Sequence, residues 1–261
     1  MRTNDVIRQS AKNALRGFWG TMVISILATI AIQSVLSSIL GTVGLNAGIS
    51  GSQTWIDFIL ENFINFAFTF GLSIMGLLLV RDSRVKLSTI FLVFDRRLYP
   101  AFFSLNLLNV FVNYVLGLLI FLPQFVLSGF NQYLELVLSF NHGFSADRSL
   151  LNQSIAFVIS LVISVILFLF LSQIISGIFQ IAIYLRYDYP ELTLGQSLKQ
   201  AWRLLKPSLW QYIWLQISLI GWFILGLLAL VIGVLWANAY AYALNAAFYE
   251  ALKEDQALTV S

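Results

Sequence analysis

Two carboxylates and an amide recur at helical spacing where the second apolar segment of the chain begins. Asp57, Glu61 and Asn65 stand at i, i+4 and i+8, which a helix places on one face. Carboxylates in or near a membrane span are costly to bury and often functional, so the pair suggests cation binding or proton transfer. The alternative is a hydrated, structural role at the outer membrane interface, which the preceding Trp55 favours.

A second group of polar side chains forms stripes on the third and fourth apolar segments. If the stripes converge, they line a hydrophilic interior or groove suited to a solute, a peptide or a lipid headgroup. The alternative is hydrogen bonding between helices, worth only about 0.6 kcal/mol per pair on average. The third segment carries Asn106, Asn109 and Asn113, and the fourth carries Gln173, Ser176, Gln180 and Tyr184.

A third group is cationic and flanks the apolar segments at both ends of the chain. We call it the basic collar, and it consists of Arg8, Lys12, Arg16, Lys199, Arg203 and Lys206. Cations beside membrane spans fix the cytoplasmic side and attract anionic lipids. A sharper alternative is that the basic collar docks a cytoplasmic partner.

Residue types that build common catalytic and metal centres are scarce. The sequence has no cysteine and one histidine, His142, which excludes disulfides and thiolate sites and disfavours a histidine relay or metal cluster. It contains no Walker A loop, GxSxG elbow or HExxH motif. The sequence therefore predicts a protein that is not an enzyme and that has no metal or cofactor.

The elements that position these side chains are predicted to be membrane spans. Of the 261 residues, 59% are hydrophobic and 10% are charged, and the mean hydropathy is +0.85. Soluble domains carry about 25% charged residues, so lipid is the expected solvent for this surface. We predict an all-α, multi-pass protein with one membrane domain over residues 1–261. Its six spans lie near 18–40, 57–80, 101–122, 154–184, 207–229 and 232–251.

Proline punctuates the third span. Pro123 is expected to end or kink it, because proline removes a backbone donor and clashes with the preceding turn. The apolar stretch 124–141 then either extends the span or lies on the outer surface.

Three amphipathic helices are predicted on the cytoplasmic face, over 3–16, 81–98 and 193–205. In the first, Val6, Ile7, Ala14 and Leu15 are expected to face the bilayer. The apolar face of the second is Leu87, Ile90, Phe91, Phe94 and Leu98. Thr193 is the expected N-cap of the third.

The distribution of basic residues predicts the orientation of the spans. Of the 15 Lys and Arg residues, only Arg148 falls on the far side of six alternating spans, so both termini are predicted to be cytoplasmic. Because these cations are scattered between apolar spans, the expected partner is anionic lipid, with no nucleic acid.

Each amphipathic segment precedes an apolar hairpin, which suggests repeat units 1–80, 81–185 and 186–261. Two of the units share a local pattern, SAKNALR over 10–16 and SLKQAWR over 197–203. Chance similarity over seven residues is the competing explanation.

Several motifs concentrate in the last quarter of the chain. They are Tyr189-Pro190, the helix SLKQAWRLLK, Ser218–Trp222, Gly233–Trp236 and Ala247–Glu250, and AKNALRGFWG stands near the start. Together they resemble the bacterial membrane-protein family filed as domain of unknown function 975. The resemblance implies a multi-pass protein of the cytoplasmic membrane, mainly in Gram-positive bacteria, without an assigned reaction. Where the family tends to have proline, this chain has Ser176 and Ala239.

The sequence as a whole predicts a non-enzymatic integral membrane protein of the bacterial envelope. It is expected to bind lipid or a membrane-protein partner, in envelope maintenance or in protection against membrane-active peptides. The alternative is a small transporter or lipid-translocating protein with an Asn/Gln-lined interior.

Overall fold

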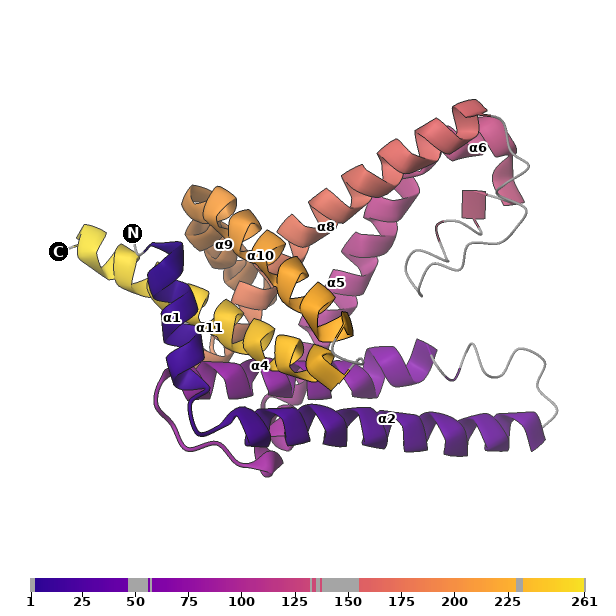
Figure 1. Ribbon diagram of the computed structural model, residues 1–261. Helices are drawn as coiled ribbons and strands as arrows, with labels where there is room; N and C mark the ends of the chain where they lie inside the picture. Colours follow the sequence, from indigo (N-terminus) through magenta and orange to yellow (C-terminus); the bar gives the residue numbers. More distant parts are fainter. Residues whose placement is uncertain are drawn as a thin grey trace. The chain divides into compact units, whose positions relative to one another are not determined.

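The computed structural model of the protein describes residues 3–46, 56, 58–131, 133–134, 137, 155–228 and 232–260. These residues form helices and no strand, which confirms the predicted all-α class (Figure 1). The chain divides into two compact units. The first unit comprises Met1–Asn106 and Ile178–Ser261, and the second comprises Leu107–Gly177.

The longest helices fall where the apolar spans are predicted. They are α2 (Trp19–Asn46), α4 (Phe66–Val80), α5 (Tyr99–Ile120), α8 (Ile155–Asp188), α10 (Leu209–Leu228) and α11 (Ile232–Val260). Five described segments are long and apolar enough to cross a membrane: Trp19–Thr42, Phe58–Val80, Tyr99–Ile120, Phe157–Asp188 and Leu194–Leu228. Helix α11 is not among these five, because its asparagine and tyrosine residues lower its mean hydropathy.

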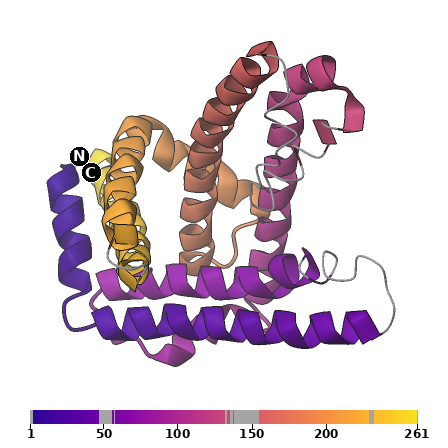
Figure 2. The ribbon, with the colours of Figure 1, turned by 45° about the vertical axis from the view of Figure 1, so that its right-hand side comes forward.

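Helix α11 is the centre of the first unit and packs against α1, α2, α4, α9 and α10. Helices α2 and α4 lie side by side (Figures 1 and 2). Glycine permits the closest approaches to α11. A Cβ atom on Gly76 of α4 would lie 2.8 Å from the carbonyl oxygen of Tyr242, and one on Gly226 of α10 would lie 2.7 Å from the backbone of Gly233.

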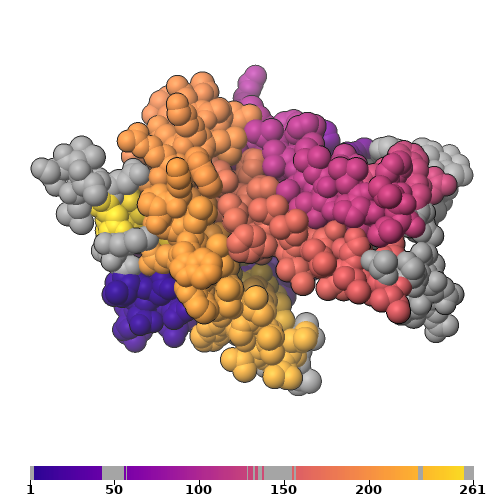
Figure 3. Space-filling view, turned by 90° about the horizontal axis from the view of Figure 1, so that it is seen from above, coloured from indigo at the N-terminus to yellow at the C-terminus, as the bar shows by residue number. Residues whose placement is uncertain are grey.

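The first amphipathic segment forms helix α1 (Asn4–Ala14), which packs on α11 and α4. It is the indigo surface in Figure 3. Ile7 in the helix and Leu15 directly after it are buried within the protein, while Val6 is exposed. The expectation that Ile7 and Leu15 face the bilayer is therefore wrong. Apolar periodicity identifies the buried side of a helix but not whether protein or lipid covers it.

The second amphipathic segment forms a 3-10 helix, η2 (Leu87–Phe94), shorter than the predicted 81–98. A 3-10 helix has three residues per turn, so residues at i and i+3 share a face. Ile90 and Val93 are accordingly buried on one face, whereas Phe91 and Phe94, which share another face, are exposed. Leu87, at the first position of the helix, is exposed as well. The predicted apolar face assumed the α-helical period.

The third amphipathic segment forms helix α9 (Leu194–Leu205), which leads through the short helix η4 (Lys206–Ser208) into α10. Thr193 caps α9, as predicted. Its hydroxyl accepts a hydrogen bond from the Gln196 backbone at 3.4 Å, and the Gln196 side chain accepts one from the Thr193 backbone at 3.0 Å. This reciprocal capping box fixes where the helix begins.

The second unit contains the rest of α5, the short helix α6 (Leu122–Ser128) and α8 up to Gly177. Pro123 stands in the first turn of α6, so α5 ends before it, as predicted. After Gly129, whose φ is +85°, the Tyr133 hydroxyl donates to the Leu118 carbonyl at 2.6 Å. The chain thus folds back onto α5 instead of extending it. Residues 138–141 lie outside the described part of the chain.

Candidate functional site

The ends of α4, α8 and α11 meet in a group of charged side chains that we call the ion cluster. It consists of Arg81, Asp188, Tyr249, Glu250 and Lys253. Two guanidinium nitrogens of Arg81 donate to the two Asp188 oxygens at 2.7 and 2.8 Å, and its Nε donates to Glu250 at 2.8 Å. Tyr249 and Lys253 also donate to Asp188, at 2.8 and 2.9 Å.

Asp188 is the hub of the ion cluster, and only 8% of its side chain is exposed. A buried carboxylate is tolerated when charged donors satisfy its oxygens, and the bidentate Arg81 pair is the strongest form of that contact. The hydrogen bonds to Asp188 raise the pKa of Arg81 above its ordinary value. Arg81 therefore stays charged, and the ion cluster ties the ends of the three helices together.

Beside the ion cluster lies a cavity of about 600 Å³, which we call the basic pocket. The end of α8, the turn that follows it, α9 and α11 line this half-open cavity. Its lining residues are Leu185, Tyr189, Glu191, Leu192, Gln200, Arg203, Leu204 and Lys253. The Lys253 ammonium also lies 5.9 Å from the centre of the Tyr189 ring. Arg203 forms no ion pair with a carboxylate of the described residues.

A second arginine, Arg186, is buried behind the wall of the basic pocket, with 8% of the residue exposed. Its guanidinium donates to the Ala101 carbonyl at 2.9 Å, and to the Ser104 hydroxyl and the Leu192 carbonyl at 3.3 Å. These acceptors are all neutral, and its Nε is buried with no partner among the described residues. A buried cation without a counter-charge is unfavourable and raises the local positive potential.

The predicted Asp57–Glu61–Asn65 stripe is altered by a π turn, η1 (Glu61–Asn65). A π turn holds more residues per turn than an α-helix, so residues four positions apart no longer lie on the same face of the helix. Glu61 is exposed, whereas Asn65 is half-buried and its side-chain oxygen has no described partner. Asp57 lies outside the described residues.

The π turn has partners on α5, within the first unit. Because the Phe66 N–H bonds to the carbonyl five residues back, the Asn62 carbonyl is released from the helix. The buried Asn106 side chain donates to that carbonyl at 3.0 Å. The Tyr99 hydroxyl donates to the Phe63 carbonyl at 2.7 Å. The Asn106 side chain therefore satisfies a backbone carbonyl of the π turn.

The remaining stripe residues lie on α5 and α8. The Asn113 side chain donates to the Asn109 carbonyl and side-chain oxygen, both at 2.9 Å, so these two bond within α5. Gln173 and Ser176 are exposed on α8 in the second unit, and Gln180 is half-buried in the first. Their convergence on one interior remains a prediction.

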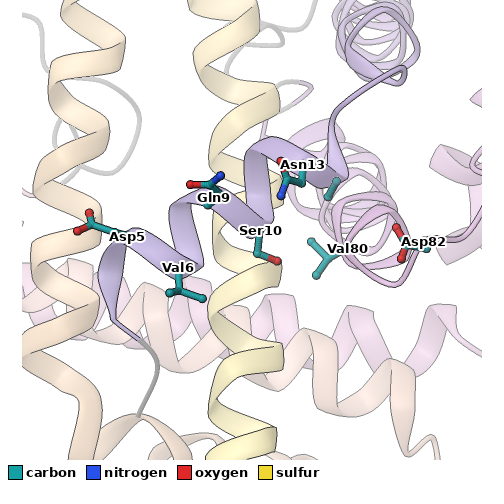
Figure 4. Close-up of a pocket in the computed structure, with 8 residues that line it drawn as sticks. Asp5, Val6, Gln9, Ser10, Asn13, Val80 and Asp82 are labelled. Carbon is teal, nitrogen blue, oxygen red and sulfur yellow. The ribbon is translucent and has the colours of Figure 1, made fainter.

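The basic collar is exposed except at Arg8, which is half-buried and pairs with Asp5 at 3.3 Å. Lys12 lies 5.6 Å from the centre of the Trp222 ring. A cavity of about 480 Å³ opens beside α1 between Asp5 and Asp82. These two carboxylates lie at its opposite ends, with residues of α1 between them, so they do not form a shared cation site (Figure 4).

Sequence reasoning missed the ion cluster. A signal existed, because Arg81, Asp188 and the i, i+3 pair Glu250 and Lys253 all stand at span ends that the predicted topology places on one side. Charges of both signs at one membrane face predict pairing, but choosing the partners requires knowing which helix ends are neighbours.

The apolar helices are consistent with a multi-pass membrane protein. A family model described as a protein of unknown function (DUF975) matches residues 1–256, so the chain belongs to that family, as its motifs predict. No curated protein and no solved structure matches the chain.

Proposed function

We propose that this protein is a non-enzymatic component of the bacterial cytoplasmic membrane that binds anionic lipid through its basic collar. The observation that supports the proposal is the exposure of Lys199, Arg203 and Lys206 and their lack of ion pairs among the described residues. All three are exposed, and none pairs with a carboxylate of the described residues. Cations left without protein partners beside apolar helices are available to lipid phosphates.

The position of these cations on α9 supports the proposal. Ser197, Ala201 and Leu204 form the buried side of the helix, while Lys199 and Arg203 lie one turn apart on the exposed side. Each cation near an anionic membrane surface contributes about 1 kcal/mol of attraction. The role that fits best is envelope maintenance or protection against membrane-active peptides.

The proposed topology has six spans, with α11 as the sixth and both termini in the cytoplasm. The less apolar α11 is accommodated because its side chains are covered by other helices; Ala243, Tyr249 and Ala247 are buried. In this arrangement α1, η2, α9 and the ion cluster lie on the cytoplasmic side.

A transport function lacks a comparable observation. Asn106 and Asn113 use their amide groups in hydrogen bonds within the described protein, and the two cavities described above are lined by other residues. Lipid binding is therefore the function that we favour.

The test is retention of lipid by the purified protein. Native mass spectrometry after exchange into an equal mixture of phosphatidylglycerol and phosphatidylcholine should show preferential retention of phosphatidylglycerol. The double variant K199Q/K206Q should lose much of that preference, since each charge contributes about 1 kcal/mol. Equal retention of the two lipids by the unaltered protein would contradict the proposal.

A further inference from the structure

We infer that the basic pocket is a phosphate-binding site, filled by the phosphate group of an anionic phospholipid or of a soluble phosphate compound. For the lipid source, the inference rests on the proposed function and assigns the headgroup a place between α8, α9 and α11. Four observations support it.

The first observation is the chemistry of Arg203. Its guanidinium lines the cavity and has no carboxylate partner among the described residues. A guanidinium presents planar, paired N–H donors that match two phosphate oxygens, and such bidentate contacts are short and strong. An exposed arginine that lines a half-open cavity is therefore suited to hold phosphate.

The second observation is the way in which Lys253 is held. Its ammonium donates one hydrogen bond to Asp188 at 2.9 Å and lies 5.4 Å from the centre of the Tyr249 ring. An ammonium has three donors, so Lys253 keeps donors for a ligand while its position is fixed by the ion cluster. Among the lining residues the only carboxylate is Glu191, against the two cations Arg203 and Lys253.

The third observation is the buried charge of Arg186. It donates to the carbonyl of Leu192, a lining residue, and only neutral oxygens accept its described hydrogen bonds. A buried cation in this position favours an anion in the adjacent cavity, because the anion supplies the counter-charge that the protein lacks.

The fourth observation is the mixed character of the lining. Gln200 and Tyr189 add neutral hydrogen-bonding groups beside the cations, and Leu185, Leu192 and Leu204 provide apolar surface. A cavity of about 600 Å³ is within the usual range for small ligands. It has room for a phosphodiester with its glycerol.

The decisive experiment compares two substitutions that each replace an exposed arginine with lysine and keep the net charge. Arg203→Lys removes the guanidinium from the basic pocket, whereas Arg84→Lys alters an exposed cation that belongs neither to the basic collar nor to the lining of the pocket. Retention of phosphatidylglycerol against dioleoylglycerol, which has no phosphate, is measured by native mass spectrometry. R203K should retain phosphatidylglycerol about tenfold less well, the loss expected for a charged hydrogen bond, and R84K should be unchanged.

A second arm tests soluble phosphate. The thermal midpoint of the detergent-solubilised protein is measured in inorganic phosphate and in chloride at equal ionic strength. A rise in phosphate that is lost in R203K assigns the site to a soluble phosphate compound. No such rise, together with Arg203-dependent retention of phosphatidylglycerol, assigns it to lipid.

The outcomes separate this inference from the proposed function. If the unaltered protein prefers phosphatidylglycerol but R203K and R84K retain it equally, the basic pocket is not the site, and lipid binding by the collar stands. If the protein shows no preference for phosphatidylglycerol and gains no Arg203-dependent stability in phosphate, both fail. Equal thermal midpoints of the two variants in chloride would verify that neither has lost its fold.

Discussion

Helices α2 and α4 have the same apolarity but opposite surroundings. In the spans Trp19–Thr42 and Phe58–Val80, the apolar 18-residue windows share a mean hydropathy of 2.1, yet 22% of the first window and 67% of the second is buried inside the protein. Hydropathy measures transfer out of water, and lipid and a protein interior satisfy it equally well. The difference between the two helices comes from packing.

Small residues and polar contacts mark the buried helix. On α4, Gly71 and Gly76 allow the backbones of η2 and α11 to approach closely, whereas Gly20 on α2 has open space around it. Arg81, directly after α4, enters the ion cluster, whereas Arg16, shortly before α2, is exposed. Membrane helices associate through this kind of close packing and hydrogen bonding, because apolar side chains gain little by leaving lipid.

The largest difference in the free energy of unfolding is expected between substitutions that affect the ends of these two helices. Asp188→Asn removes the charge that Arg81 and Lys253 share, and leaves both cations only partly compensated. Loss of one partner of a buried ion pair costs about 3–5 kcal/mol, so the free energy of unfolding in mixed detergent micelles should fall by about 3 kcal/mol. Arg16→Gln, the matched change beside α2, should alter it by less than about 0.5 kcal/mol. Equal effects would refute the contrast between the two helix ends.

The second largest difference in the free energy of unfolding is expected between glycine substitutions in α4 and in α2. Gly76→Ala places a Cβ atom 2.8 Å from the Tyr242 carbonyl oxygen, so α4 and α11 must separate slightly. We expect a loss of about 1–3 kcal/mol, measured from the same unfolding titration. Gly20→Ala, with nothing within 4 Å of the added atom, should be neutral or stabilise α2 by up to about 1 kcal/mol. A neutral Gly76→Ala would mean that the two helices are not in close contact.

The smallest difference in the free energy of unfolding is expected between substitutions of polar side chains that contact the two helices. Asn106→Ala removes the donor to the Asn62 carbonyl at the π turn that leads into α4, and should cost about 1–2 kcal/mol because that carbonyl is left without its donor. Thr29→Val on α2 removes a hydroxyl that donates to the Ser25 carbonyl of its own helix at 2.9 Å. That change should stay within about 0.5 kcal/mol, because the carbonyl belongs to the helical ladder already. Matching losses would indicate that the π turn does not depend on Asn106.

Local features were predictable from the sequence. Apolar stretches located the long helices, Pro123 ended α5, and Thr193 with Gln196 capped α9. Each depends on residues within a few positions of one another, where propensity and capping act directly. The register of the Asp57–Glu61–Asn65 stripe was not predictable, because the π turn depends on α5 side chains more than thirty residues away.

The all-α class and the approximate positions of the apolar helices follow from composition and periodicity, which reflect how each segment meets water or lipid. Membership of the family follows from its motifs. The contacts between distant segments depend on the fold: α4 and α11 are central, Ile7 is covered by protein, and Arg81 meets Asp188 and Glu250. The basic pocket joins residues from α8, α9 and α11. Its existence depends on which helix ends are neighbours, and the local pattern of no single segment contains that information.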